Sequence, residues 1–356
     1  MGITNVGIIG MGHISNIYCE NLMTVHENTT VLACADVNVE AAKAKAEKWG
    51  IPEVLTVEEI LAREDIEIIV NLTPPKAHYE ISKKALEAGK HVYTEKPLAT
   101  NTQEANELVE LAREKGLMLG CAPETNYGAG VSTAKELLAK GTIGKILYAD
   151  ARFRWPGDEN WHPNPEFLYQ PGAGPLFDRG PYFLTVLVDL LGKADSVFSM
   201  TSVGFPTRTI TSKPKYGQVF KVETPSHVQG LIRFHSGVIC STLFSFDLHC
   251  PYDSAIEIFG TEGSILIKEP IGFGNPVKVS KNCGEYEDVP LVNERTGNIR
   301  GYAVACMAEA LEEGRKDHPA PGTIGRHVVE IMEKYLESAE CGAMVAVESA
   351  PRGETL

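Results

Sequence analysis

The sequence contains no apolar run long enough to cross a membrane, because a spanning helix needs about 20 mostly apolar residues. It has no basic segment at its start, and residues 6–10 are typical of a first core strand rather than of a secretion signal. It has no excess of positive charge either: the formal net charge is -14, which opposes nonspecific attraction to nucleic acid or anionic membrane. We therefore expect a soluble protein with no membrane and no nucleic-acid partner.

Cysteine pairs with the spacing of a redox or zinc motif are also missing. The eight cysteines are scattered without a C-x-x-C, at positions 19, 34, 121, 240, 250, 283, 306 and 341. This pattern favours free thiols in a reducing compartment over disulfides or a zinc site. We expect a cytoplasmic protein without a bound metal.

Sequence signatures of several enzyme classes are absent as well. There is no H-E-x-x-H pair, no G-x-S-x-G turn and no phosphate-binding G-x-x-x-x-G-K-[ST]. His227, His235 and His249 are too widely spaced to replace the first of these, so we expect core or surface histidines. Hydrolase and phosphotransferase functions are left without support.

A chain of 356 residues is longer than one hydrophobic core usually grows, so two domains are expected. Residues 1–122 alternate short apolar strands with amphipathic helices, which is typical of a Rossmann-type, doubly wound parallel sheet. The strands are expected at 6–9, 30–36, 54–55, 66–72, 91–95 and 117–122, and the helices at 14–22, 39–49, 57–62, 76–88 and 102–115.

Residues 123–356 have a different pattern of expected elements, in which strands follow one another with few helices between them. The strands are expected at 145–154, 194–204, 219–235, 238–247, 254–268 and 274–280, and the helices at 128–139, 183–191, 301–313 and 323–341. The pattern predicts an α+β domain with an open, largely antiparallel sheet, whose last helices could pack back toward the first domain. An open sheet of this kind favours a homodimer or homotetramer.

Gly10-x-Gly12 stands between the first expected strand and the first expected helix. It matches the start of the dinucleotide-binding pattern G-x-G-x-x-G, with Ser15 in place of the third glycine. The glycines allow a tight turn and close approach of the backbone to a pyrophosphate, and the helix start, with His13 and Ile14, offers unpaired N–H groups. The motif predicts dinucleotide binding.

Asp36 ends the second expected strand, where an acidic residue contacts the adenosine ribose in such domains. Val37 and Asn38 follow it, and no arginine or lysine adjoins them in the sequence to hold a 2′-phosphate. We therefore expect NAD as the cofactor, with NADP the less favoured choice.

Two further turns follow strands at the same sheet edge. Thr73-Pro74 comes after the fourth strand and can line the nicotinamide side of the cofactor, and His78 nearby is either a cofactor contact or an ordinary histidine near a helix start. Glu95-Lys96-Pro97 comes after the fifth strand, and its proline fixes the backbone next to the lysine. An ammonium at this place can reach the ligand crevice of an open α/β sheet. Lys96 is therefore the first catalytic candidate, and both Glu95 and Lys96 are cofactor-binding candidates.

Together with a later segment, Gly172-Ala173-Gly174-Pro175-Leu176-Phe177-Asp178-Arg179-Gly180-Pro181-Tyr182, these motifs resemble the glucose-fructose oxidoreductase / inositol dehydrogenase / rhizopine-catabolism (Gfo/Idh/MocA) family over essentially the whole chain. In that family the lysine of the E-K-P tripeptide is catalytic, and a glycine-rich segment that opens a helix of the second domain supplies an aspartate and a histidine. The resemblance implies catalytic roles for Lys96 and Asp178, and it places Tyr182 where the family pattern has the histidine. Members that act on sugars, including the glucose-fructose enzyme, also resemble this chain in having tyrosine there.

The chemistry that this family implies is hydride transfer between nicotinamide and a secondary alcohol. Oxidation of the alcohol needs a base for the hydroxyl proton and a donor for the developing alkoxide, and Lys96 can be that donor. A tyrosine hydroxyl, whose ordinary pKa is about 10, needs a nearby ammonium to act as a base at neutral pH. We therefore expect Lys96 and Tyr182 to converge beside the cofactor, with Asp178 orienting the lysine or binding a sugar hydroxyl. The alternative is that the aspartate caps a helix and the tyrosine belongs to the core.

Residues 152–165, RFRWPGDENWHPNP, form a polar and aromatic stretch without periodicity. Tryptophan faces stack on the apolar side of sugar rings, and arginine and histidine bind hydroxyls, so this stretch supplies three substrate-binding candidates, Arg154, Trp161 and His162. The other substrate-binding candidates are Lys96, Asp178 and Tyr182. The alternative is an ordinary connector braced by prolines.

These observations predict an NAD-dependent oxidoreductase that acts on a secondary alcohol or ketone of a sugar, a sugar derivative or a polyol. Two alternatives stay open. One is a catalytically silent nucleotide-binding sensor or scaffold of the same fold, against which an intact Lys96 and Asp178 argue. The other is a reductase of a non-sugar substrate such as a cyclic diol or a tetrapyrrole.

Overall fold

The computed structural model describes residues 2–351, and the chain divides into two compact units. One comprises Met1–Glu124, Asn298–Val329 and Ala350–Leu356, and the other comprises Thr125–Gly297 and Glu330–Ser349. The segment Asn298–Val329 therefore groups with the N-terminal unit, although it lies far along the chain. In the part of the chain that the structure describes, no helix has the combination of length and apolar character that crossing a bilayer requires.

The first unit is built on a six-stranded sheet in the order β3-β2-β1-β4-β5-β6. Its strands are β1 (Thr4–Ile9), β2 (Thr29–Ala35), β3 (Glu53–Val54), β4 (Ile68–Asn71), β5 (His91–Thr94) and β6 (Leu119–Cys121). Every pairing is parallel, so the predicted doubly wound parallel sheet is confirmed. The strand order reverses between β1 and β4, and ligands of such sheets bind at the carboxyl ends of the strands beside this reversal.

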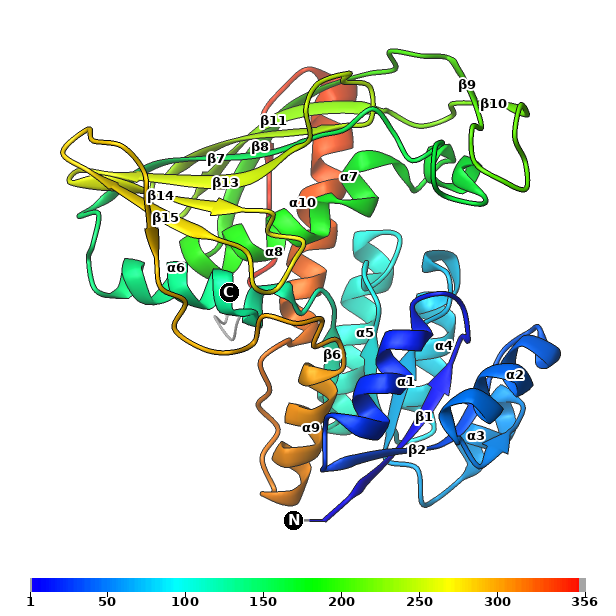
Figure 1. Ribbon diagram of the computed structural model, residues 1–356. Helices are drawn as coiled ribbons and strands as arrows, with labels where there is room; N and C mark the ends of the chain where they lie inside the picture. The colour runs from blue at the N-terminus through cyan, green and yellow to red at the C-terminus, as the bar shows by residue number, and fades with distance from the viewer. Residues whose placement is uncertain (1, 352–356) are drawn as a thin grey trace. The chain divides into compact units, whose positions relative to one another are not determined.

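The helices of the first unit begin and end at residues suited to those places. They are α1 (Ser15–Thr24), α2 (Val39–Trp49), α3 (Val57–Ala62), α4 (Pro75–Glu87), α5 (Thr102–Lys115), α9 (Tyr302–Glu312) and the first part of α10 (Gly322–Cys341). Asn38 and Asn101 accept N-terminal N–H groups of α2 and α5, and Thr56 forms a capping box with Glu59 on α3. In Figure 1, α1 lies beside α2 and α4 lies beside α5, in agreement with their contacts.

The second unit contains a nine-stranded sheet in the order β16-β15-β14-β13-β7-β12-β11-β8-β17. Its strands are β7 (Ile146–Arg154), β8 (Ala194–Ser202), β11 (His227–Phe234), β12 (Ile239–Ser245), β13 (Asp253–Gly260), β14 (Gly263–Lys268), β15 (Val277–Lys281), β16 (Glu287–Val289) and β17 (Val345–Ala346). Among the strand pairs of this sheet in the described residues, only β7–β12 is parallel, so the prediction of a largely antiparallel sheet is confirmed. A separate hairpin joins β9 (Thr207–Thr209) and β10 (Val219–Lys221).

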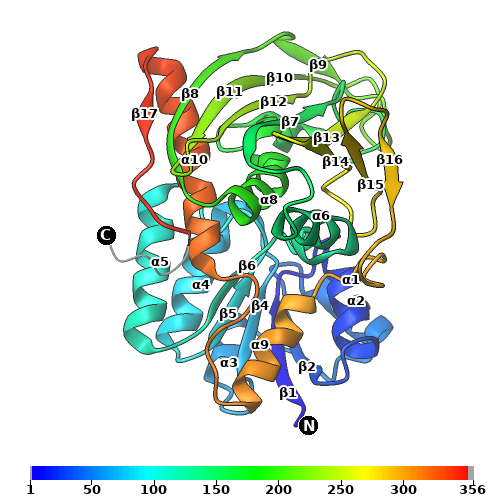
Figure 2. The ribbon, with the colours of Figure 1, turned by 90° about the vertical axis from the view of Figure 1, so that its left-hand side faces the viewer.

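Helices cover one face of this sheet. They are α6 (Ala129–Ala139), α7 (Gly174–Asp178), α8 (Gly180–Leu191) and the second part of α10. Phe183 of α8 packs on Phe153 of β7 and Phe244 of β12, with ring centroids 6.2 and 5.5 Å apart. Figure 2 shows the sheet curving around α6 and α8. Apolar residues on one face of each strand and on the facing helices therefore form the core.

Two expected strands were wrong in extent. The strand expected at 219–235 is interrupted at 222–226, where Pro225 has no N–H to donate, and the one expected at 254–268 turns at Thr261-Glu262 between β13 and β14. The short elements β9, β16, β17 and α7 were not expected at all. A stretch of two to five residues is too short to show a hydrophobic period, and such strands form because a neighbour pairs with them.

Candidate active site

The turn after β1 has the geometry that dinucleotide binding needs. Gly10 adopts φ +100°, and a Cβ there would lie 2.6 Å from the backbone of Leu72 and Thr73, so only glycine fits. A Cβ on Gly12 would meet nothing within 4 Å among the described residues, so its backbone faces open space. Ser15, in the third glycine position, is fully buried and donates its hydroxyl to Gly12 O at 2.8 Å. A small residue therefore serves in place of glycine.

Donor groups and a cation surround this turn. The N–H groups of His13 and Ile14, just before α1, have no hydrogen-bond partner in residues 2–351. Lys45 of α2 donates to Gly12 O and, at 2.8 Å, to Ser15 Oγ. Partial burial lowers the pKa of Lys45. Free N–H groups and an ammonium fit a pyrophosphate, and Lys45 is a cation that the local sequence pattern did not reveal.

Asp36 follows β2 and contacts the same turn. Its Oδ2 accepts the N–H of Met11 at 2.6 Å, and its Oδ1 accepts the N–H of Asn38 at 2.7 Å. A carboxylate has about four acceptor positions, so both oxygens can still accept ribose hydroxyls. The structure thus brings the predicted ribose-binding acid together with the predicted pyrophosphate turn.

The turn after β4 is held by buried side chains. Asn71 Oδ1 accepts the Thr73 hydroxyl at 2.7 Å, and its amide donates to His78 O and to Ser82 Oγ. His78 is 1% exposed, and its ring nitrogens lie 2.6 Å from Pro97 O and 2.7 Å from Thr73 O. Burial lowers the pKa of His78. His78 therefore links the turns after β4 and β5, and a direct contact with the cofactor stays a prediction.

The predicted catalytic tripeptide follows β5 and is fixed through its glutamate. Glu95 Oε2 accepts the Lys96 backbone N–H at 3.0 Å, and Glu95 Oε1 accepts the Tyr18 hydroxyl at 2.9 Å. Tyr18 is a fully buried residue of α1, and burial raises its pKa. The helix that begins at the dinucleotide turn is thus bonded to the residue beside Lys96. Tyr18 was not among the expected site residues.

The second unit brings Asp178 and Tyr182 together around an arginine. Asp178 ends α7, Tyr182 lies in the first turn of α8, and Arg179 stands between the two helices. Arg179 Nε is 3.1 Å from Asp178 Oδ2, and Arg179 Nη2 is 2.8 Å from Asp158 Oδ2. Burial opposes its charge, but Asp178, Asp158 and Tyr182 together raise the pKa of Arg179. Sequence reasoning missed Arg179 and Asp158, although the first adjoins a candidate.

The substrate-binding candidates of the 152–165 stretch lie in two places on the second unit, with Trp161 and His162 together and Arg154 apart. Trp161 is 57% exposed, and its ring meets that of His162 at 5.3 Å. Arg154 ends β7 and pairs with Asp253 at 3.3 Å, on the face opposite Phe153, which packs against α8. The structure therefore does not group Arg154 with the cluster of Asp178 and Tyr182 on the helical face.

Lys96 belongs to the first unit, and Asp178 and Tyr182 belong to the second. Their action on one substrate stays a prediction, as do the individual roles of all the residues above. In residues 2–351, no three His, Cys, Asp or Glu side chains are grouped as metal ligands would be.

The first unit has a parallel sheet, a glycine turn, free N–H groups at a helix start and an acidic residue after β2. These features define the class of proteins with a dinucleotide-binding Rossmann unit, and in this chain an α+β unit accompanies it. Residues 4–122 match the family model described as "Oxidoreductase family, NAD-binding Rossmann fold". Residues 131–266 match the model described as "GFO/IDH/MocA C-terminal domain". The chain belongs to the Gfo/Idh/MocA family of oxidoreductases. The predicted family and its NAD-binding fold are therefore confirmed.

Individual relatives are more distant. An oxidoreductase of Schizosaccharomyces pombe is 35% identical over 44% of this chain and 42% of that protein, and the chain spans about half the length of this and similar curated relatives. A 1,5-anhydro-D-fructose reductase of Ensifer adhaerens is 29% identical over 83% of each chain. The solved structure of a levoglucosan dehydrogenase in complex with NADH and L-sorbose has a TM-score of 0.84 at 23% identity, over 98% of this chain and 100% of that one. At this identity the structural likeness shows the fold.

Proposed function

We propose that the protein is an NAD-dependent oxidoreductase that transfers a hydride between nicotinamide and a secondary alcohol or ketone of a sugar, a sugar derivative or a polyol. The observation that carries this proposal is the Lys96 turn. Lys96 is the second residue after β5, at the edge where such sheets bind ligands, and Tyr18 of the dinucleotide-binding helix donates a hydrogen bond to its neighbour Glu95. The names of relatives, a 1,5-anhydro-D-fructose reductase and a levoglucosan dehydrogenase, support a sugar substrate.

The cofactor would be held by residues of the first unit. Backbone groups of Gly10, Gly12, His13 and Ile14 would contact the pyrophosphate, Asp36 the ribose, and the turns at Thr73-Pro74 and Glu95-Lys96 the nicotinamide side. When bound, NAD accepts the hydride of the alcohol or, as NADH, supplies one to the ketone. The carboxylate of Asp36 would repel a 2′-phosphate, which favours NAD over NADP.

The remaining chemistry falls to side chains of the chain itself. The Lys96 ammonium would donate a hydrogen bond to the substrate oxygen, on which negative charge develops as its proton leaves. Tyr182, in its phenolate form, would accept that proton, and Asp178 would accept a hydrogen bond from a neighbouring hydroxyl. Asp178 is suited to this because its carboxylate is paired with the Arg179 guanidinium at 3.1 Å, which favours its charged, hydrogen-bond-accepting form.

A homodimer or homotetramer in a reducing cytoplasm completes the proposal. Leu231, Ile239 and Met200 are 45%, 47% and 71% exposed on neighbouring strands of the second sheet, on the side away from α8. An apolar surface of this kind suits self-association. The eight cysteines are all free thiols, which suits a reducing compartment. Light scattering on the wild type and on Leu231→Glu would measure the assembly, which the charge should weaken.

A substrate panel tests the proposed activity. Purified protein is mixed with NAD or NADP and single sugars, anhydrosugars and polyols, and reduced nicotinamide is followed by its absorbance. We expect turnover of at least one sugar with NAD, and a lower kcat/KM with NADP. Asp36→Ala should reduce the preference for NAD by about tenfold or more. Tight NADH binding without turnover of any sugar or its ketone would contradict the proposal and favour a silent nucleotide-binding protein.

A further inference from the structure

Asp158, in the loop between β7 and α7, is only 2% exposed and accepts hydrogen bonds from three side chains. Its Oδ1 accepts the indole N–H of Trp155 at 2.9 Å and that of Trp161 at 3.0 Å. Its Oδ2 accepts Arg179 Nη2 at 2.8 Å. One oxygen therefore orients two aromatic rings, and the other holds a cation.

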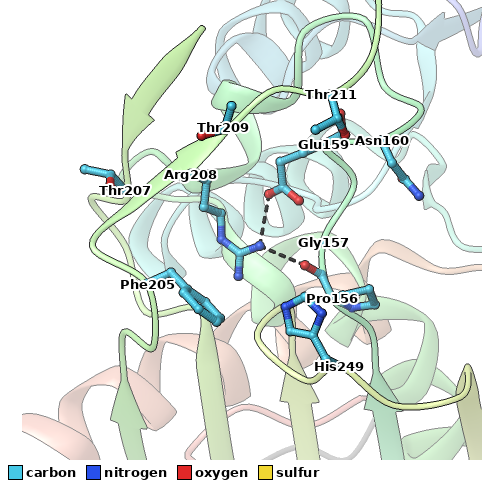
Figure 3. Close-up of a pocket in the computed structure, with 10 residues that line it drawn as sticks. All are labelled: Pro156, Gly157, Glu159, Asn160, Phe205, Thr207, Arg208, Thr209, Thr211 and His249. Atoms are coloured by element: carbon cyan, nitrogen blue, oxygen red, sulfur yellow. Dashed lines mark hydrogen bonds and ion pairs between the residues drawn. The ribbon is translucent and has the colours of Figure 1, made fainter. Parts of the chain in front are cut away.

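The other side of this loop is fixed independently of Asp158. Arg208 of β9 donates from Nη1 to Pro156 O at 2.8 Å and to Glu159 Oε1 at 3.1 Å, and Figure 3 shows it pointing at this segment. Glu159 O accepts the N–H groups of Thr211 and Ser212 at 2.9 and 2.8 Å. Because these contacts keep the loop in place, the Asp158 contacts mainly decide where the indole rings and the guanidinium point.

Arg179 continues the chain of contacts toward the predicted catalytic carboxylate. It donates to Asp158 and lies 3.1 Å from Asp178 Oδ2. Its guanidinium also lies over the Phe153 ring, with 5.4 Å between Cζ and the ring centroid, which restricts its position further. A change at Asp158 is thus transmitted to Asp178 through one rigid, planar group.

We propose that Asp158 is a positioning residue that sets the orientation of the Trp161 ring and, through Arg179, of the Asp178 carboxylate. This inference rests on the proposed function, because it assigns Trp161 to stacking on a sugar ring and Asp178 to a sugar hydroxyl. A ring face and a carboxylate tied to one buried anion keep a constant relative geometry. Such a pair selects a ring with an apolar face and a hydroxyl at one fixed place beside it, so it selects neutral cyclic sugars over open-chain polyols.

Asp158→Asn tests the two sets of hydrogen bonds that the carboxylate accepts, one from the indoles and one from Arg179. An amide has one oxygen, so whichever way it turns, either the indoles or Arg179 lose their acceptor. We expect kcat/KM for the best cyclic sugar to fall about 100-fold, with both a lower kcat and a higher KM. Trp161→Phe keeps the Arg179 contacts and removes one indole, so we expect KM to rise about tenfold with kcat nearly unchanged. Trp161 is exposed, so this second variant is expected to fold.

The matched control is Asp189→Asn on α8. Asp189 is a carboxylate whose side chain is 1% exposed and pairs with Lys135, which is 49% exposed, so the change neutralises a similarly buried carboxylate elsewhere in the unit. We expect kcat and KM of the folded control within about twofold of the wild type. If Asp158→Asn and Asp189→Asn had equal kinetic constants per folded molecule, or if Trp161→Phe left KM unchanged, the positioning role would be overturned.

A spectroscopic measurement separates failure of this inference from failure of the proposed function. The sequence has three tryptophans, so near-ultraviolet circular dichroism of the substrate-free protein reports mainly on Trp155 and Trp161, with Trp49 in the other unit as background. We expect the tryptophan bands to change in Asp158→Asn and to stay as in the wild type in Asp189→Asn. An unchanged spectrum in Asp158→Asn would overturn the inference even if the wild type oxidises sugars. A wild type that turns over no sugar would refute the proposed function, and the spectra would still decide whether Asp158 orients the rings.

Discussion

The Lys96 turn of the first unit and the Asp178 turn of the second are held in different ways. Lys96 follows a strand in a parallel sheet, and its neighbour Glu95 is bonded to Tyr18 of α1 and to a backbone N–H. Asp178 lies at the end of a five-residue helix, beside the Arg179 guanidinium, which forms one ion pair with it and another with Asp158. The first turn depends on regular secondary structure, and the second depends on a few charged groups.

The two units also treat buried carboxylates differently. Asp158 is buried against the Arg179 guanidinium. Glu124, at the end of the first unit's N-terminal segment, accepts the N–H groups of Gly301 and Tyr302 at 3.2 and 3.0 Å. The pKa of Glu124 is raised to about 7, because the effect of burial is larger than the opposing effects of these bonds and of the charge of Arg300. Burial therefore lets Glu124 take up a proton near neutral pH, although hydrogen-bond donors and a cation lie near its carboxylate.

Among the changes that act on stability as well as on turnover, removing the cation of the second unit should have the largest effect. Arg179→Ala leaves Asp158 buried without this counter-charge and removes the guanidinium that lies beside Asp178. We expect a loss of about 3 kcal/mol in the free energy of unfolding. We also expect a fall in kcat/KM of about 100-fold or more. Urea denaturation and steady-state kinetics measure the two losses.

The control for Arg179 is Arg233→Ala, which removes an exposed arginine paired with Asp195 at 2.8 Å. Exposed pairs contribute about 1 kcal/mol or less, so this variant should be nearly as stable as the wild type. Similar losses in both variants would show that burial of the Arg179 cluster has no special importance.

Glu124 should make stability depend on pH in a defined direction. Its pKa is raised in the folded state, so its contribution is fully present below about pH 4.5 and is lost as the pH rises to about 7. In Glu124→Gln no group titrates at this position. Between these pH values, the free energy of unfolding of the wild type should therefore fall by up to about 3 kcal/mol more than that of the variant. Urea denaturation of both proteins at several pH values measures the difference between their free energies of unfolding. The other titrating groups are the same in both proteins, so their contributions cancel in this difference. Parallel curves would contradict the assignment.

Loss of the Tyr18 hydroxyl should have the smallest effect of the three. Tyr18→Phe leaves one Glu95 oxygen without its donor, so we expect a loss of about 1–2 kcal/mol in unfolding free energy. We expect kcat to fall about tenfold because the Lys96 turn loosens, with little change in the Kd for NADH. Tyr335→Phe, which removes a buried hydroxyl bonded to Thr242 in the other unit, should lose similar stability and keep its kcat. Equal kcat values in the two variants would refute the link between Tyr18 and Lys96.

The two units also differ in how much of their structure could be predicted from the sequence. In the first unit the helices at 39–49, 57–62 and 102–115 were predicted with their observed bounds, because their caps and periods are local signals. The residues expected at the dinucleotide turn and at Asp36 do lie together, since the carboxyl ends of parallel strands share one edge. Lys45 and Tyr18 could not be predicted, because their contacts depend on how a helix packs.

In the second unit the type of sheet was predictable from the succession of strands, but the cluster around Asp178 was not. Asp158 and Arg179 are separated by 21 residues, and nothing in their sequence context indicates an ion pair. The resemblance to a family named Asp178 and Tyr182, and the geometry adds the arginine between them. Contacts between loops follow from tertiary packing, which a single sequence without regular periods does not show.

The most direct test of the account is the activity of Lys96→Ala with NAD and the best sugar substrate, measured beside its binding of NADH. The control is Lys83→Ala, which removes an ammonium paired with Glu107 at 3.5 Å in the same unit. We expect Lys96→Ala to lose turnover by about 1,000-fold or more. It should bind NADH within about threefold of the wild type, and Lys83→Ala should keep both properties. Near-wild-type turnover in Lys96→Ala would contradict the central claim that this lysine acts on the substrate oxygen.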